Sequence, residues 1–152
     1  GGNMEIRRLT GRDLGLMEEL LDLFAEVFHD FETYGSARPS AAYQRDLLDD
    51  GAFAALVATE RGKVVGGLTA YELRKFEQAR SEFYLYDLAV AEGHRRRGIA
   101  SALIEALKRL AAERRAHVIF VQADWEDEAP VALYSKLGRR EDIHHFDIPV
   151  TP

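Results

Sequence analysis

The stretch YLYDLAVAEGHRRRGIASALIEALKRL, residues 84–110, organises the rest of the chain. It opens with an apolar, aromatic-rich run that ends at Val90, as is typical of a buried strand. A basic turn at residues 94–97 follows and leads into Gly98. Beyond the turn, apolar residues recur every third or fourth position and so share one face of a helix: Ile99, Leu103, Ile104, Leu107 and Leu110. The stretch therefore predicts a strand, a tight glycine turn and the N-terminus of a helix.

The junction between this strand and this helix is suited to an anion. The first N–H groups of a helix have no internal partner and carry a partial positive charge. Gly98 and Ala100 remove side-chain bulk, so that a ligand can approach the backbone closely. The three arginines of the turn add positive charge for phosphates. Neither G-x-x-x-x-G-K-[ST] nor G-x-G-x-x-G is present, which excludes an NTPase phosphate loop and a dinucleotide fingerprint. The alternative is a basic loop that only caps the helix.

Length and composition predict one soluble globular domain over residues 4–150. The chain has 152 residues, of which 47% are hydrophobic and 30% charged, a balance that excludes a disordered chain. Gly1, Gly2 and Asn3 precede Met4 and are interpreted as residues left by cloning. No apolar run is long enough to cross a membrane and no signal peptide is visible, so we expect no membrane partner and a cytoplasmic protein.

Cysteine and histidine usage limits the chemistry. The chain has no cysteine, which excludes disulfides, thiolate metal sites and a cysteine nucleophile. The histidines lack the H-x-x-x-H spacing and cysteine partners of a metal centre, so no metal is expected. His29, at the end of the first predicted helix, is either a favourable C-terminal charge or a residue that reaches the acceptor.

The net charge of −6 bears on the partners. Binding to nucleic acid needs a basic face to neutralise phosphates, so nucleic acid is not the expected partner. An acidic surface attracts a cationic small molecule by long-range electrostatics. Against this background the basic turn at residues 94–97 stands out.

The remaining elements follow in order along the chain. The pattern predicts strands at residues 4–9, 53–59, 64–73, 117–123 and 141–148, besides the one ending at Val90. It predicts helices from residue 14, with Thr10 as N-cap, at residues 41–48 after Pro39-Ser40, and from Pro130 to residue 137, before Gly138. Residues 30–36 are expected to be a loop. Gly66-Gly67 inside a strand indicates a bulge or a close approach of backbone. The order is β-α-α-β-β-β-α-β-α-β, an α/β (α+β) fold.

The basic turn resembles a known cofactor loop. Residues 95–100, RRRGIA, match the [Q/R]-x-x-G-x-[G/A] loop of the Gcn5-related N-acetyltransferases. The resemblance implies a single-domain acetyltransferase fold, whose mixed, mostly antiparallel sheet splays between the strand ending at Val90 and the one ending near Ala123. It also implies acetyl-CoA, with its pantetheine arm along the backbone of Leu88, Ala89 and Val90. Its pyrophosphate would lie on the loop residues Arg95, Arg96, Arg97, Gly98, Ile99, Ala100 and Ser101.

A second segment bears on the chemistry. Acetylation of an amine by a thioester needs a neutral amine, a polarised carbonyl and a proton for the leaving thiolate. Residues 131–138, VALYSKLG, resemble the family's A-x-x-[L/F]-Y-x-x-x-G-F signature, with Arg139 in place of the final aromatic residue. The resemblance implies that Tyr134 is the general acid, and a tyrosine pKa of ~10 is close to that of an alkyl thiol. The alternative is a core tyrosine with a satisfied hydroxyl.

Acidic residues indicate the acceptor side. Residues 124–128, DWEDE, carry four carboxylates just after a predicted strand. Such a loop either is solvated and stabilises the next helix or binds a polycation and takes up its proton. Glu82, Tyr84 and Asp87 on the neighbouring strand are placed to converge on the same space.

Five segments sharpen the resemblance: residues 85–90, 94–100, 118–124, 132–138 and 145–148 are similar to the type I aminoglycoside 3-N-acetyltransferases, which act on gentamicin. The resemblance implies transfer to the 3-amino group in a ternary complex, antibiotic resistance and a homodimer. It further implies that Asp124 is the base or a substrate carboxylate, and that other ammonium groups are held by Glu126, Asp127 and Asp147. Two alternatives stay open: an acetyltransferase for another polyamine or a protein amine, and a non-catalytic acyl-CoA-binding domain.

Overall fold

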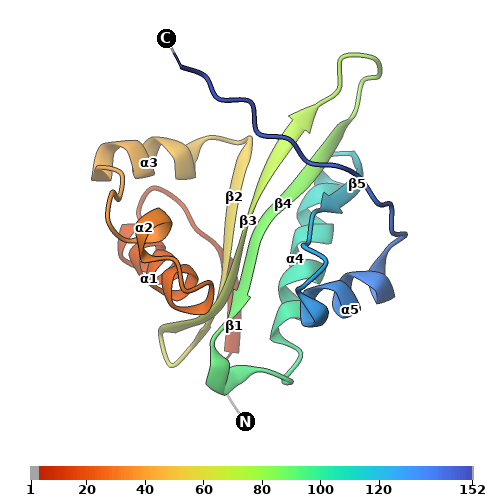
Figure 1. The fold of residues 1–152 in the computed structure, drawn as a ribbon. Helices are drawn as coiled ribbons and strands as arrows, with labels where there is room; N and C mark the ends of the chain where they lie inside the picture. Colours follow the sequence, from red (N-terminus) through yellow and green to blue (C-terminus); the bar gives the residue numbers. More distant parts are fainter. Residues whose placement is uncertain (1–3, 152) are drawn as a thin grey trace. The chain divides into compact units, whose positions relative to one another are not determined.

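The computed structural model describes residues 4–151 and divides the chain into two compact units between Val121 and Gln122. The first unit contains β1 (Met4–Arg8), α1 (Leu14–Val27), α2 (Phe31–Tyr34), α3 (Ala41–Asp49), β2 (Phe53–Glu60), β3 (Lys63–Arg74), β4 (Ser81–Val90), the 3-10 turn η1 (Glu92–His94), α4 (Ile99–Glu113) and β5 (Ala116–Val121) (Figure 1). The second unit contains α5 (Glu128–Leu137). Each unit is described by itself.

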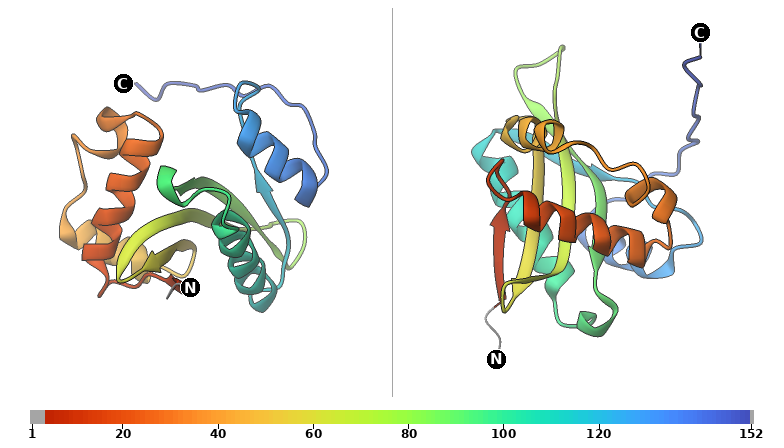
Figure 2. Two further views of the ribbon diagram at one scale, coloured as in Figure 1. Left: turned by 90° about the horizontal axis from the view of Figure 1, so that it is seen from below. Right: turned by 90° about the vertical axis from the view of Figure 1, so that its left-hand side faces the viewer.

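The first unit is built on a five-stranded sheet in the order β1-β2-β3-β4-β5. The pairs from β1 to β4 are antiparallel, whereas β5 lies parallel to β4. A parallel pair needs a crossover, and α4 supplies it. The mixed, mostly antiparallel sheet predicted from the sequence is therefore confirmed. Helices α1 and α3 cover one face of the sheet and α4 covers the other (Figure 2).

Each face of the sheet buries a helix stripe. Leu20 and Phe24 of α1 are buried in one hydrophobic cluster with Val57 and Ala89 of the sheet. On the other side α4 buries a face that includes Leu103 and Leu107. This sandwich of helix, sheet and helix fixes β4, the strand on which the candidate site depends.

Two adjacent glycines of β3 let both helices approach closely. A Cβ on Gly66 would lie 2.9 Å from Ile99 Cγ2 of α4, and one on Gly67 would collide with Leu20 of α1. The β2–β3 register also shifts at this place, between Ala58 and Thr59. The sequence indicated a bulge or a close approach at Gly66-Gly67: the close approach is found at both glycines, and the bulge lies at the neighbouring Val65.

A second irregularity lies in β4. The β3–β4 register passes from Thr69↔Asp87 to Ala70↔Leu85, so Tyr86 is an extra residue. Such a bulge puts two consecutive side chains on one face of a sheet. The ring of Tyr86 contacts Tyr71, and the carboxylate of Asp87 reaches Tyr34 of α2. Both side chains therefore lie on the α1 face.

The sheet opens along β4. The β4–β5 pairs run from Ser81↔Ala116 to Leu85↔Val121 and end there, whereas β4 continues to Val90. The backbone of β4 beyond Leu85 thus extends past its pairing with β5. This agrees with the splay that the family resemblance implied.

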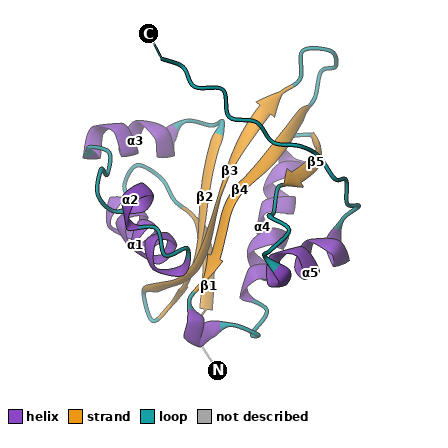
Figure 3. Ribbon diagram, in the orientation of Figure 1, coloured by secondary structure: helices purple, strands orange, loops and turns teal. Residues whose placement is uncertain are grey.

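Three local predictions differ from the structure. Helix α1 begins at Leu14, so Asp13 and not Thr10 occupies its N-cap position, without a side-chain cap hydrogen bond. The Asp13 carboxylate instead accepts from the Thr10 N–H at 2.8 Å. Residues 31–34 form α2 inside the predicted loop, because Asp30 caps this turn through the Thr33 N–H. The strand predicted at residues 141–148 is wrong, since these residues have no regular secondary structure (Figure 3). Alternating apolar side chains favour a strand only beside another strand, and the described part of the second unit contains none. The interpretation of residues 1–3 lies outside the described residues.

Candidate active site

The turn between β4 and α4 has the backbone of an anion cradle. Arg96 and Gly98 adopt positive φ of 63° and 76°. Helix α4 begins at Ile99, and no side chain among the described residues caps its first turn. The N–H groups of this turn are therefore free of a side-chain cap and point to the loop. A Cβ on Gly98 would meet nothing within 4 Å, so the backbone is open to a ligand. These features fit the pyrophosphate of acetyl-CoA.

The three arginines of the turn differ in their surroundings. Arg97 forms an ion pair with Glu60 of β2 at 2.9 Å, and Glu60 Oε1 lies 3.8 Å from His94 Nε2. These contacts tie both ends of the turn to β2. Arg95 and Arg96 are exposed. Arg97 therefore anchors the turn, and Arg95 and Arg96 are the side chains better placed to meet a phosphate.

Asp87 is the most distinctive group on β4. It is half-buried, and its carboxylate accepts a hydrogen bond from the Tyr34 hydroxyl at 2.8 Å. Burial raises the pKa of Asp87, while the hydrogen bond from Tyr34 acts in the opposite direction. Burial likewise raises the pKa of Tyr34, with the Asp87 charge adding to it, so this hydroxyl stays protonated and donates. Asp87 directly precedes Leu88 and so lies in the part of β4 that extends past its pairing with β5. A carboxylate with a raised pKa at such a place is a candidate functional group.

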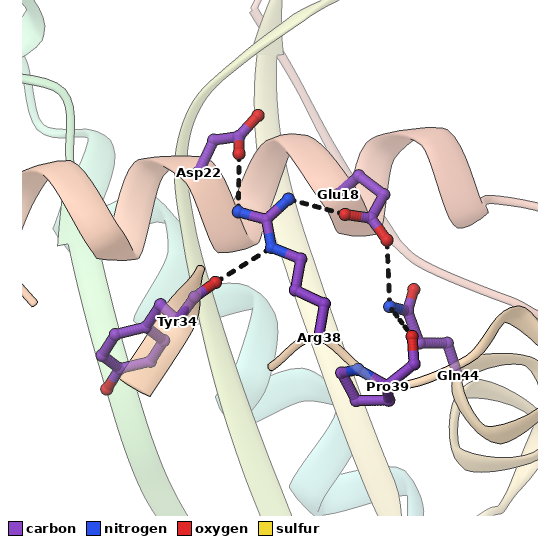
Figure 4. A network of polar contacts seen from close by, with 6 residues as sticks. All are labelled: Glu18, Asp22, Tyr34, Arg38, Pro39 and Gln44. Carbon is purple, nitrogen blue, oxygen red and sulfur yellow. Dashed lines mark hydrogen bonds and ion pairs between the residues drawn. The ribbon is translucent and has the colours of Figure 1, made fainter. Parts of the chain in front are cut away.

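Tyr34 is fixed in turn by Arg38, as Figure 4 shows. The Arg38 Nε–H donates to the Tyr34 carbonyl at 2.9 Å. Its other two nitrogens pair with Glu18 and Asp22 of α1, each at 2.6 Å. Gln44 of α3 donates to the other Glu18 oxygen at 3.0 Å. One guanidinium thus joins α1, α2 and, through Glu18, α3.

The sequence prediction missed Tyr34 and Arg38. Tyr34 lies 53 positions from Asp87 in the chain, and residues 30–36 were interpreted as a loop. The Asp30 cap is the one local signal for α2. No local pattern indicates which strand a short helix will face.

The other predicted acceptor residues of β4 have partners of their own. Glu82 pairs with Lys75 at 3.2 Å and lies 3.3 Å from His117. The hydrogen bond from Lys75 lowers the pKa of Glu82, so this carboxylate is charged but already compensated. The ring of Tyr84 stacks on Phe120 of β5 with centroids 4.7 Å apart.

The predicted residues of the second unit lie in α5 and its flanking segments. Tyr134 is half-buried in α5. Asp124 and Glu126 are exposed in the preceding loop, and Asp127 occupies the N-cap position of α5. Asp147, in the tail, lies 2.9 Å from His145 Nε2. The roles of these residues toward the groups of the first unit remain predictions.

A pocket of about 290 Å³ lies beside the start of the anion turn. It is bounded by the end of α1, the start of α2 and the segment after β4, and its polar lining comprises Glu26, His29, Glu92 and Arg95. His29 adopts a positive φ of 52° at the end of α1. His29 and Arg95 therefore both line this pocket, beside the turn at residues 94–97.

Residues 4–151 contain neither a metal-binding cluster nor a membrane-spanning helix. No group of three or more His, Asp or Glu side chains there is arranged to hold a metal ion. None of the helices in this range has the length and apolar character needed to cross a membrane.

An open β4 edge, a turn before α4 suited to an anion and a half-buried carboxylate on β4 are features that fit an acetyltransferase site. The acetyltransferase (GNAT) family profile matches residues 17–138. The chain belongs to this family.

Solved structures narrow the comparison. An aminoglycoside acetyltransferase from an uncultured soil metagenomic sample is 60% identical, with a TM-score of 0.95 over 98% of this chain and 99% of that one. A second such enzyme, also from a soil metagenome and solved in complex with sisomicin, is 32% identical, with a TM-score of 0.89 over 97% of each chain. The same enzyme has been solved with trehalose.

A curated relative is more distant. N-acetyltransferase family 8 member 2 of Rattus norvegicus is 30% identical over 91 residues. The match covers 59% of this chain and 40% of the rat protein.

Proposed function

We propose that this protein transfers the acetyl group of acetyl-CoA to the 3-amino group of an aminoglycoside, giving resistance to it. The observation that carries the proposal is the half-buried Asp87 beside the open segment of β4, held by the Tyr34 hydroxyl at 2.8 Å. The similarity to aminoglycoside acetyltransferases at 60% and 32% identity supports the acceptor class. In keeping with the resemblance to the 3-N-acetyltransferases, the protein would act in the cytoplasm as a homodimer.

Acetyl-CoA supplies the acetyl group as a thioester. The backbone of Leu88, Ala89 and Val90 would hold its pantetheine arm as an added strand, since β4 runs past its pairing with β5 here. The turn from Arg95 to Ser101 would hold its pyrophosphate by backbone N–H groups, with charge from Arg95 and Arg96.

The acceptor amine must lose a proton before it attacks the acetyl carbonyl carbon. Asp87 is our candidate for the group that takes this proton, because burial has already raised its pKa. Asp124 is the base that the resemblance implies, so the two carboxylates are tested against each other. The new C–N bond forms as the C–S bond breaks, and Tyr134 gives its proton to the departing thiolate. The attacking nitrogen then loses its second proton, which restores the Tyr134 hydroxyl, so the products are the amide, the CoA thiol and the protonated base.

The acceptor would carry several ammonium groups besides the one that reacts. Glu126, Asp127 and Asp147 are exposed carboxylates suited to hold them. Because such contacts are made equally to the substrate and to the transition state, their loss should raise KM more than it lowers kcat.

Thiol release from acetyl-CoA tests the proposal, with gentamicin, spermidine and a lysine peptide as parallel acceptors. We expect release with gentamicin and an acetylated 3-amino group in the product by NMR. Asp87→Asn should lower kcat by about 10²–10⁴, the usual contribution of a general base, and Tyr134→Phe should also lower kcat. A large loss in Asp124→Asn with normal rates in Asp87→Asn assigns the base to Asp124. No release with any amine, despite binding of CoA, contradicts the proposed activity and favours an acyl-CoA-binding domain.

A further inference from the structure

A continuous row of aromatic rings crosses the α1 face of the sheet. It starts at Phe53 of β2, whose ring lies 5.2 Å from that of Tyr71 of β3. Tyr71 and Tyr86 meet edge to face at 5.6 Å, and Tyr86 and Tyr84 at 5.5 Å. Tyr84 stacks on Phe120 of β5 at 4.7 Å. Strands β2, β3 and β5 therefore contribute one ring each to the row, and β4 contributes two.

The β4 bulge is what brings Asp87 to the face of this row. In a regular strand Tyr84 and Tyr86 would share one face, and Asp87 would lie on the other. The extra residue Tyr86 in the ladder to β3 shifts the alternation, so that Asp87 follows Tyr86 on the same face. The bulge thereby places a ring and a carboxylate side by side.

The row is buried at its Phe53 end and exposed to solvent in the middle. Phe53 is 4% exposed and belongs to the hydrophobic core. Tyr71 and Tyr86, by contrast, are 37% and 54% exposed. The ring contacts hold the exposed rings in fixed orientations, so stacking a ligand on them costs little conformational entropy. From β3 to β5 the row spans about 10 Å, two interstrand spacings.

The chemistry of the row selects its ligand. An exposed aromatic face attracts apolar C–H surface, and it also attracts a cation through its ring quadrupole. Asp87 adds a carboxylate beside the row, next to Tyr86 in sequence and on the same face. Saturated six-membered rings that carry ammonium groups present both kinds of surface. Acyclic polyamines offer the charge without the ring face.

We propose that Tyr71, Tyr86 and Tyr84 form a ring-stacking platform for the acceptor, on which amino-sugar or aminocyclitol rings lie with an ammonium group toward Asp87. This inference rests on the proposed function and names the part of the site that recognises the acceptor's ring skeleton. The platform binds the substrate and is distinct from the groups that move protons.

Three variants test whether the aromatic ring of Tyr86 itself binds the acceptor. Tyr86→Leu removes the ring and keeps apolar bulk, whereas Tyr86→Phe keeps the ring and removes the hydroxyl. Phe76→Leu is the matched control, because Phe76 is 99% exposed in the β3–β4 connection and has no part in the row. Each variant is titrated with trehalose, a neutral sugar, and with sisomicin, with tyrosine ring signals followed by NMR. Acetylation of sisomicin is measured in parallel.

We expect wild type, Tyr86→Phe and Phe76→Leu to bind both probes alike. Tyr86→Leu should raise the Kd for trehalose and the KM for sisomicin about tenfold, which corresponds to a loss of ~1.4 kcal/mol. The KM for acetyl-CoA should not change. Equal affinities of Tyr86→Leu and wild type, or no saturable shift of the tyrosine signals with either probe, would overturn the platform. If the wild type binds trehalose through the row but acetylates no aminoglycoside, the proposed function fails and the platform stands.

Discussion

Arg38 offers the sharpest test of how the site is held together. We expect Arg38→Met, which keeps the apolar stem and removes the guanidinium, to destabilise the fold by about 1–3 kcal/mol. Each ion pair, to Glu18 and to Asp22, contributes only ~0.2–1 kcal/mol, because those carboxylates are 45% and 69% exposed. The hydrogen bond to the Tyr34 carbonyl adds ~0.5–1.5 kcal/mol.

Thermal unfolding measures this loss. For a chain of this length ~1 kcal/mol shifts Tm by about 2–4 °C, so Arg38→Met should unfold about 2–12 °C below wild type. The control is Lys108→Met, which breaks an ion pair to Glu105 at 3.3 Å between two largely exposed side chains. Its effect should stay below ~0.5 kcal/mol. At 1 M salt the Debye length is ~3 Å, which weakens the ion pairs of the wild type, so the difference in Tm between wild type and Arg38→Met should become smaller.

Arg38→Met should also change the pKa of Asp87 in the candidate active site. Without Arg38 the Tyr34 backbone loses its tie to α1, and the hydrogen bond from Tyr34 to Asp87 weakens. The pKa of Asp87 should then rise, which moves the acidic limb of kcat/KM to higher pH. A stability loss no larger than that of Lys108→Met would refute the energetic reasoning. An unchanged pH profile in a destabilised Arg38→Met would refute the coupling to Asp87.

Three further predictions concern β4 and its neighbours. Tyr34→Phe should raise the pKa of Asp87, because the lost hydrogen bond lowered it, so the acidic limb of kcat/KM should shift to higher pH with little change in kcat at high pH. Asp87→Asn should raise the free energy of unfolding at pH 7. Because the pKa of Asp87 is higher in the folded than in the unfolded state, ionisation of this carboxyl destabilises the fold once the pH exceeds both values. In urea unfolding, Asp87→Asn should therefore be more stable than wild type at pH 7 but not at pH 3, where the carboxyl is protonated in both states. Gly66→Ala should cost ~1–3 kcal/mol, because its Cβ would lie 2.9 Å from Ile99 Cγ2, whereas Gly93→Ala, with nothing within 4 Å, should change stability by less than ~0.5 kcal/mol in the same urea titration.

Local patterns account for most of the fold. The apolar period from Ile99 to Leu107 corresponds to buried positions of α4, and Ser40 caps α3 through the Tyr43 N–H as the sequence suggested. Gly66-Gly67 marked a real close approach. Signals of this kind lie within a few residues of one another, which is why sequence reasoning can recover them.

The parts that failed depend on contacts far apart in the chain. The sequence predicted a strand at residues 141–148, but a strand also requires a neighbour that no local pattern supplies. The bulge at Tyr86 could not be read from an aromatic-rich run, because it is defined by the register with β3. The link from Tyr34 to Asp87 was invisible for the same reason.

The extra residue in β4 also bears on how this enzyme can evolve. Since Tyr86 has no register partner on β3, the ladder on either side of it keeps its pairing whatever side chain stands there. Its neighbours Leu85 and Asp87 are constrained by the core and by α2, respectively. Position 86 is therefore a place where natural variation can alter the surface of the sheet while the register of the strands is kept. Homologues with different acceptor ranges should differ at this position more often than at either neighbour.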